Sequence, residues 1–216
     1  MTTTEKENTM GHFVKWGSTP RFHKGLHVTE KIDGTNGCVI IYDGVVRAQS
    51  RKRLITPDDD NFGFARWVYD NAGALTDALG WGYHYGEWFG EGIQKNPLGI
   101  EGKRFALFNT WHWARPENSE KLEQVDGLGH VPVLYDEQRD GPAHYYTIPD
   151  LIDDLWVSGS RVEGAAEAMP DLWPDRRKRA EGIIVWHRES QQKYKILLED
   201  DDAHKWEKPL KVVTLV

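Results

Sequence analysis

Apolar and polar positions along the chain predict two β-hairpins, one near each end. Residues 39–49 form two apolar runs around Asp43-Gly44, and this dipeptide between such runs is the strongest short signal for a two-residue type I′ turn. Towards the C-terminus, the runs 182–186 and 192–197 predict a second hairpin. The polar residues before position 25 are expected to be a frayed end that leads into a first strand.

Three further segments are predicted as extended chain. They are residues 81–88, 104–109 and 131–135. Proline has no backbone N–H to donate to a neighbouring strand, so Pro132 makes the last of them an edge strand.

A change in the spacing of apolar residues along the chain indicates the helices. Apolar residues three and four positions apart predict an amphipathic helix over residues 62–79, with Asn61 as its N-cap. Thr147 is expected to cap a shorter helix whose apolar face is Leu151, Ile152, Leu155 and Trp156. Residues 116–128 are predicted to be a polar excursion, and residues 162–169 a short helical piece.

Hairpins combined with a few helices predict an α+β fold of mostly antiparallel sheets. A length of 216 residues fits one domain that spans residues 1–216, with residues 1–10 flexible. No internal repeat and no shift in composition marks a second domain.

Composition narrows the class of protein. A hydrophobic content of 39% and a charged content of 28% are ordinary for a globular protein. No apolar run approaches the length of a membrane span, and the polar residues 1–8 contain no secretory signal. The single cysteine, Cys38, excludes an internal disulfide and a thiolate metal cluster, so a cytoplasmic location is the default expectation.

The net charge of −7 argues against a protein that coats nucleic acid non-specifically, because that mode of binding needs broad neutralisation of phosphates. A local basic track is still compatible with an acidic protein. Two runs are candidates, 51–53 and 176–179, and the plain alternative for each is a solvated charged face.

The stretch 30–36, Glu-Lys-Ile-Asp-Gly-Thr-Asn, carries the first candidate chemistry. A lysine amine is a poor nucleophile while it is protonated, and it becomes reactive when it is desolvated or placed beside other cations. Lys31 and Asp33 would share one face if the following strand extends back through them, and Gly34 would let the backbone approach a ligand phosphate. The plain alternative is a solvated lysine followed by an Asp-Gly turn.

Five more short motifs follow in order at the ends of later strands or on them. They are Ser50-Arg51, Tyr85-Gly86-Glu87, the aromatic strand 105–108, Glu181-Gly182 and Lys193-Tyr194-Lys195. The series resembles the covalent nucleotidyltransferase superfamily of polynucleotide ligases and mRNA capping enzymes. It is most similar to the phage-type ATP-dependent RNA ligases, with Gly34-Thr35-Asn36 and residues 131–134 as further cues, and the resemblance covers residues 30–197.

The resemblance implies a nucleotidyltransferase (adenylation) domain without an OB-fold domain, which uses ATP together with magnesium or manganese. Lys31 would be the nucleophile that forms lysyl-AMP, and Asp33 would assist it. Lys193 and Lys195 alternate along a strand, so both would face the α-phosphate, where cations stabilise the transition state.

Three other side chains would bind the nucleotide and its metal. Glu181 would hold the divalent cation, directly or through water. Glu87 would accept hydrogen bonds from the ribose hydroxyls. Phe108 would stack on the adenine, whereas Phe105, at odd spacing from it, should pack in the core.

The RNA end would meet a second group of residues. Arg51 has a planar guanidinium suited to a phosphate, here that of the accepting 5′ end, and Asn36 would hold the substrate end. The complete nucleotide-binding set implied by the resemblance is Glu30, Lys31, Asn36, Arg51, Glu87, Phe108, Glu181, Lys193 and Lys195.

Two features depart from the superfamily. Asn109 follows the adenine-stacking phenylalanine where aspartate is common. Few residues follow Lys195, so neither an OB-fold nor the helical C-terminal module of many RNA ligases is expected. Intrinsic RNA affinity is therefore expected to be low, and a separate RNA-binding partner would fit.

The sequence thus predicts an ATP-dependent RNA ligase that joins 5′-phosphate to 3′-hydroxyl ends of RNA, free or in a nicked duplex, without a membrane. The alternatives are a minimal DNA ligase, a guanylyltransferase that uses GTP, and a nucleotide- or RNA-end-binding protein without ligation activity. A further alternative is an interaction domain in which the motifs are coincidental.

Overall fold

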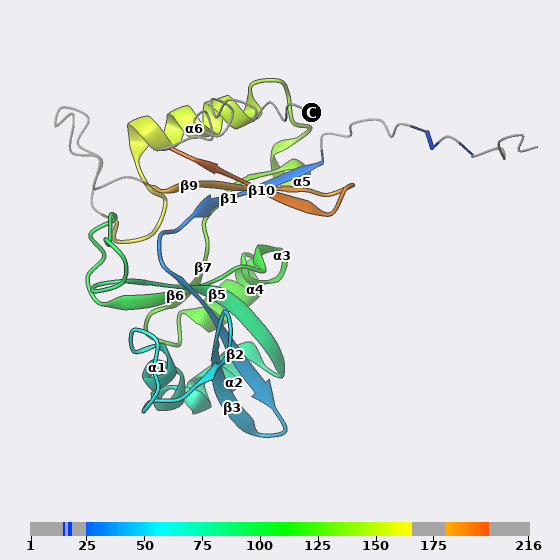
Figure 1. Cartoon of the computed structure of the whole chain (residues 1–216). Helices are drawn as coiled ribbons and strands as arrows, with labels where there is room; N and C mark the ends of the chain where they lie inside the picture. The colour runs from blue at the N-terminus through cyan, green and yellow to red at the C-terminus, as the bar shows by residue number, and fades with distance from the viewer. Residues whose placement is uncertain (1–14, 16, 19–24, 166–179, 199–216) are drawn as a thin grey trace, which may run out of the picture.

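The computed structural model describes residue 15 and residues 17–18, 25–165 and 180–198, and its strands form two sheets (Figure 1). The four-stranded sheet has the order β10-β9-β1-β8 and is antiparallel throughout. Its strands are β1 (Leu26–Lys31), β8 (Val133–Asp136), β9 (Gly182–His187) and β10 (Gln192–Leu197).

Helix α6 (Thr147–Ser158) covers one face of the four-stranded sheet, above it in Figure 1. The fully buried Leu155 packs there in a cluster with Val28, Ile183 and Val185. The apolar face predicted for this helix is confirmed, since its other three members pack against the same cluster. The opposite face of the sheet carries the alternate residues, Lys31 among them.

The six-stranded sheet has the order β4-β3-β2-β5-β6-β7, and all its neighbours are antiparallel except the pair β6 and β7. Its strands are β2 (Thr35–Tyr42), β3 (Val45–Ser50), β4 (Leu54–Ile55), β5 (Gly82–Gly90), β6 (Lys103–Leu107) and β7 (Leu128–His130). The predicted α+β fold of mostly antiparallel sheets is confirmed.

Helices α1 (Phe64–Asp70), α2 (Ala72–Leu79) and α4 (Pro116–Leu122) contribute to the core of the six-stranded sheet. Two short helices, α3 (Thr110–Trp113) and α5 (Glu137–Asp140), follow β6 and β8. Among the residues described, no helix is long and apolar enough to cross a membrane.

Alternation along β2 shows which face of the six-stranded sheet the helices cover. Val39 and Ile41 are completely buried in the core with Phe64 of α1, whereas Tyr42 on the opposite face is mostly exposed. We call this opposite side, which also carries Tyr83 and Glu87 of β5, the open face. The β2–β3 hairpin turns at Asp43 and Gly44 with φ of 51° and 73°, as the predicted type I′ turn requires.

The chain crosses between the sheets twice, first between β1 and β2 and then between β7 and β8, at Val131-Pro132. The Val131 N–H donates to the Leu107 carbonyl at 3.1 Å, and the Pro132 carbonyl accepts from the Glu30 N–H at 2.9 Å. The prediction of one strand over 131–135 is therefore wrong, because Pro132 lies where the chain changes sheets. The strand that follows, β8, is an edge strand as expected.

Two helix predictions were wrong for local reasons. Residues 62–79 form two helices, because the chain departs from helical geometry at Asn71, whose side chain donates to the Trp67 carbonyl at 2.8 Å. Asn61 is not the N-cap: Gly63 occupies that position, and the Asp60 carboxylate accepts from two N–H groups of the first turn.

Other element predictions have mixed outcomes. The polar excursion predicted for residues 116–128 begins with a helix, α4, whose first residue is Pro116, a favoured position for proline. Thr147 is the first residue of α6 rather than its cap, which is Tyr146. Residues 162–165 are not helical, and the rest of the piece predicted to 169, like the basic run 176–179, lies outside the described residues.

Cys38 on β2 is predicted to resist thiol reagents while the protein is folded. Burial raises the pKa of its thiol to about 11, and only the thiolate reacts. At pH 8 the thiolate fraction is then roughly two-hundredfold below that of a free cysteine. Timed reaction with dithionitrobenzoate measures this, with protein unfolded in urea as the control. Equal rates in the two samples would contradict the prediction.

Candidate active site

The first crossing between the sheets places the candidate nucleophile. Lys31 is the last residue of β1, and the chain turns through Ile32, Asp33 and Gly34 into β2. The prediction that Lys31 and Asp33 share one face of a strand is wrong, because the strand ends between them. Ile32, within this turn, is buried in a small hydrophobic cluster with Phe89, which holds the turn in place.

Gly34 has a packing reason as well as the predicted functional one. A Cβ at this position would lie 2.5 Å from the Trp88 carbonyl oxygen and 2.9 Å from Glu87 Cγ. Any side chain would therefore push the start of β2 away from β5 at the point where the chain changes sheets.

Lys31 Nζ makes an ion pair with Glu181 Oε2, and the two side chains are 24% and 28% exposed. Glu181 immediately precedes β9, whose first residue, Gly182, is in register with Lys31. Glu181 Oε2 has no hydrogen bond among the described residues, so this ion pair is the interaction that holds it. The predicted nucleophile and the predicted metal ligand are thus brought together.

Lys193 and Lys195 lie on the same face of the four-stranded sheet as Lys31. Lys195 is in register with Ile184 and Lys193 with Trp186, and these two residues of β9 are paired with Thr29 and His27 of β1. Side chains alternate along strands, so all of these residues face the same way. Strands β1 and β10 are separated by β9, so they lie about 10 Å apart, with Ile184 and Trp186 of β9 between them on this face.

A hydrogen-bonded chain organises the other side of the site, at the open face of the six-stranded sheet. Asn36 Nδ2 donates to Glu87 Oε2 at 3.0 Å, and Asn36 Oδ1 accepts from the Arg51 guanidinium. These residues come from β2, β5 and the segment after β3. Asn36 therefore fixes the orientation of both Glu87 and Arg51, a role that its place in the motif did not indicate.

Burial raises the pKa of Glu87 to about 7. Repulsion by Glu181 and Asp33 contributes to this net rise, while Lys31 and Arg51 oppose it. These interactions place four other predicted site residues within electrostatic reach of Glu87. The site combines cations with carboxylates, one of which titrates near neutral pH.

The two phenylalanines of the aromatic strand separate as predicted. Phe105 is completely buried and packs on Phe64, with ring centroids 4.9 Å apart. Phe108, just beyond β6, is 39% exposed, and its N–H donates to the Tyr85 carbonyl at 2.9 Å. An exposed ring next to Glu87's strand is available for stacking on a ligand.

Glu30 is the predicted site residue whose side chain points elsewhere. Its buried carboxylate accepts from the Ser160 hydroxyl at 2.5 Å and from the Arg161 N–H at 2.7 Å, and burial raises its pKa. The side chain thus holds the segment after α6 against β1. A role of Glu30 in nucleotide binding stays a prediction, and so does the role of Asp33 in assisting Lys31.

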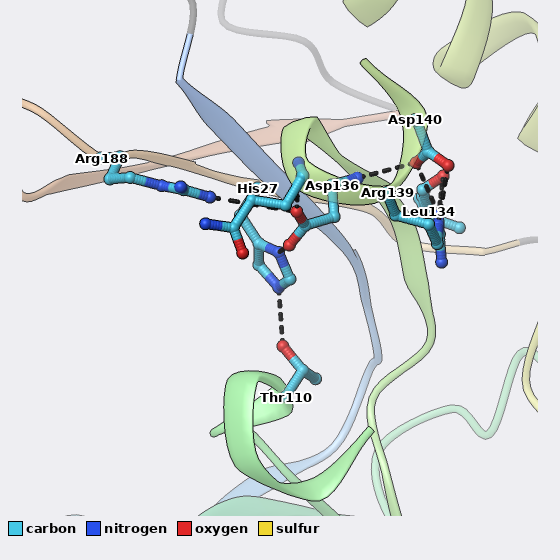
Figure 2. A network of polar contacts seen from close by, with 8 residues as sticks. His27, Thr110, Leu134, Asp136, Arg139, Asp140 and Arg188 are labelled. Carbon is cyan, nitrogen blue, oxygen red and sulfur yellow. Dashed lines mark hydrogen bonds and ion pairs between the residues drawn. The ribbon is translucent and has the colours of Figure 1, made fainter. Parts of the chain in front are cut away.

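A polar network centred on the buried His27, drawn in Figure 2, lies next to the candidate site. His27, on the same face of β1 as Lys31, contacts Asp136 Oδ2 through Nδ1 and Thr110 Oγ1 through Nε2, each at 2.7 Å. Asp136 ends β8, and Thr110 begins α3, two residues after Phe108. The network therefore ties the four-stranded sheet to the segment that positions Phe108.

Trp111 and Arg188 complete this network. The Trp111 ring stacks on His27 with centroids 5.2 Å apart, and the Arg188 guanidinium lies 4.6 Å from the Trp111 ring centroid. Arg188 also approaches Asp136 Oδ1, at 3.9 Å. Nothing in the sequence indicated His27 or Thr110, because their partners lie 83 and 109 residues away along the chain.

Another contact that the sequence did not indicate involves Gln94, in the loop after β5. Its side-chain amide donates to the Gly34 carbonyl at 3.4 Å. This contact ties the loop to the turn after Lys31.

The carboxylates fit a divalent cation that binds together with phosphate. Among the described residues, no group of three His, Cys, Asp or Glu side chains could hold a metal ion by itself. Magnesium is usually held by one or two carboxylates plus substrate phosphates and water. Glu181, whose Oε2 is paired with Lys31 in this structure, is the carboxylate predicted for this role.

The arrangement of the two sheets matches the nucleotidyltransferase-type fold of RNA ligases. The RNA ligase family model matches residues 24–213. The chain therefore belongs to the RNA ligase family. Among curated proteins, no match to the chain is found.

Solved structures of Naegleria gruberi RNA ligase share this fold. A glutamate-to-alanine variant with ATP and Mn is 16% identical with a TM-score of 0.52, and the match covers 88% of this chain and 58% of that one. A lysine-to-methionine variant with AMP and Mn is 19% identical with a TM-score of 0.51, and the match covers 84% and 51%. The chain thus spans just over half the length of these proteins, and at such identity the likeness shows the fold alone.

Glu87→Gln is predicted to stabilise the protein at pH 8 but not at pH 5. Because the pKa of Glu87 is raised to about 7, the stability associated with its protonated form is complete below about 4.5 and is lost as the pH rises through about 7. Glutamine mimics the protonated form, so the gain at pH 8 should be about 3 kcal/mol.

Urea unfolding of both proteins at the two pH values measures this gain. Glu101→Gln, at an exposed position, is the control and should change stability at neither pH. An equal effect of Glu87→Gln at both pH values would show that its carboxylate does not titrate in this range.

Thr110→Val and His27→Ala are predicted to be coupled. Each leaves a buried partner without its hydrogen bond, which costs about 1–3 kcal/mol. The double variant should lose less than the sum of the two, by about 0.5–3 kcal/mol. Urea unfolding gives the cycle, with Thr76→Val, whose hydroxyl bonds within α2, as the control. Additive losses would rule out a shared network.

Proposed function

We propose that the protein is an ATP-dependent RNA ligase that works through lysyl-AMP on Lys31. The observation that carries this proposal is the convergence of Lys31, Glu181, Lys193 and Lys195 beside the open face that holds Glu87. Membership in the RNA ligase family supports it. So do the ATP, AMP and Mn in the matched Naegleria structures.

In the first step the unprotonated Lys31 amine attacks the α-phosphorus of ATP. A bond forms between Nζ and phosphorus, the bond to the bridging oxygen breaks, pyrophosphate leaves in line, and the nitrogen releases a proton to solvent. In its resting state Lys31 is paired with Glu181, so it must separate from this carboxylate and lose a proton before it attacks. Lys193 and Lys195 neutralise the charge that develops on the phosphates.

The nucleotide is held from the six-stranded sheet. The adenine stacks on Phe108, and Glu87, oriented by Asn36, accepts hydrogen bonds from the ribose hydroxyls. A divalent cation, Mg²⁺ or Mn²⁺, would be held by Glu181 and would neutralise phosphate charge.

Two further transfers complete ligation. A 5′-phosphate of RNA attacks the AMP phosphorus and displaces Lys31, and a 3′-hydroxyl then attacks the activated phosphate and releases AMP. Arg51, held by Asn36 at the edge of the site, binds the 5′-phosphate with its planar guanidinium.

Purified protein incubated with α-labelled ATP and magnesium should retain the label on a denaturing gel. Lys31→Ala and Lys31→Arg should both reduce labelling by about a thousandfold or more, because arginine keeps the charge but is not a nucleophile. Lys121→Ala, at an exposed position on α4, is the matched control and should label normally.

A chase with 5′-phosphorylated RNA should move the label from the protein to the RNA. Labelling by GTP in place of ATP would assign the protein to capping-type chemistry. Labelling that persists in Lys31→Arg would exclude Lys31 as the nucleophile.

A further inference from the structure

Four large aromatic side chains lie exposed beyond the proposed nucleotide site. Tyr83 and Tyr85 precede Glu87 in the chain and lie on the same side of β5. Trp81 lies just before that strand, and Tyr42 ends the neighbouring β2. Their exposed fractions are 53%, 61%, 69% and 68%. We call these four residues the aromatic row.

Strand register places the row on the open face. Asn36 is paired with Glu87, Cys38 with Tyr85 and Ile40 with Tyr83, so alternate residues of β2 and β5 share this face. The rings of Tyr83 and Tyr85 are nearly parallel, 15° apart, with centroids 6.4 Å from each other. The Tyr42 and Trp81 rings are also neighbours, at 5.9 Å.

The row is not needed for the core of the sheet. His84, between Tyr83 and Tyr85, and Gly86, between Tyr85 and Glu87, alternate with the row along β5 and are buried. Single exposed aromatics are ordinary, but adjacent ones that extend from a ligand site form a surface suited to a partner.

Cations lie beside the row on the next strand. Arg47 of β3 is exposed and is in register with Ile40, which is itself paired with Tyr83. Arg51, one residue beyond β3, reaches the site through Asn36. Aromatic rings flanked by arginines match a strand of nucleic acid, since its bases stack on the rings and its phosphates pair with the guanidinium groups.

The row is continuous with the proposed active site. Tyr85 accepts a hydrogen bond from the Phe108 N–H through its carbonyl, and it is two residues from Glu87. We infer that the aromatic row stacks on the bases of the single-stranded RNA that adjoins the end held in the site. This inference rests on the proposed function for the identity of the polymer, but its binding surface does not depend on catalysis.

The test measures anisotropy of a fluorescein-labelled 12-nucleotide oligouridylate with the full chain, without ATP. Tyr83→Ala and Trp81→Ala should each weaken binding about fivefold or more, as expected for loss of one stacked base. Tyr83→Phe keeps the ring and should restore binding. Tyr145→Ala is the matched control, because Tyr145 is 86% exposed but lies before α6, away from the open face.

Arg47→Gln provides a second measurement. Loss of one phosphate contact should reduce the slope of log affinity against log salt concentration by about 0.7 for a single strand. The aromatic variants should leave this slope unchanged.

Three results would overturn the inference: no binding of the oligouridylate by the unmodified protein, unchanged binding in both alanine variants, or an unmodified protein that is a dimer and becomes monomeric in Tyr83→Ala. The last result would assign the row to a second copy of this chain.

Self-labelling with ATP, run on the same samples, tests the proposed function separately. A protein that labels but binds RNA without the row refutes only the inference, and one that binds through the row but does not label refutes only the ligase.

Discussion

The close approach between Gly34 and the Trp88 carbonyl is the constraint on which the rest of the structure depends. A Cβ there would lie 2.5 Å from that oxygen, so only glycine allows the chain to pass from β1 to β2 at this point. The crossing leaves Lys31 at the end of one sheet and Asn36 at the start of the other. The residues proposed to bind phosphate and those proposed to bind the nucleoside therefore lie close together, although they belong to different sheets.

The site combines charges that stabilise one another only in part. Lys31 and Glu181 are paired, while Glu87 is buried deeply enough to raise its pKa to about 7. A carboxylate in such a place lowers the stability of the protein at neutral pH. Under the proposed function, this carboxylate is kept because it binds the ribose hydroxyls. A carboxylate whose pKa is shifted in this way is typical of a ligand-binding or catalytic site.

The sequence by itself determined the two hairpins, the Asp43-Gly44 turn and the series of motifs in the candidate site. The Asp43-Gly44 turn and the final hairpin follow from local patterns, because turn geometry and side-chain alternation depend on neighbours in the chain. The order of the motifs identified the family. The assignment of Phe105 to the core and Phe108 to the surface also followed from alternation along one strand.

Only the tertiary structure decided how these parts meet. The division of the predicted strand at Pro132, the bracing of Phe108 through His27, and the diversion of the Glu30 side chain to Ser160 depend on residues far apart in the chain. Local patterns cannot report such contacts, since they record which face a side chain takes and not what lies opposite. For the same reason the aromatic row was visible as separate residues but became a surface only when β2 and β5 were paired.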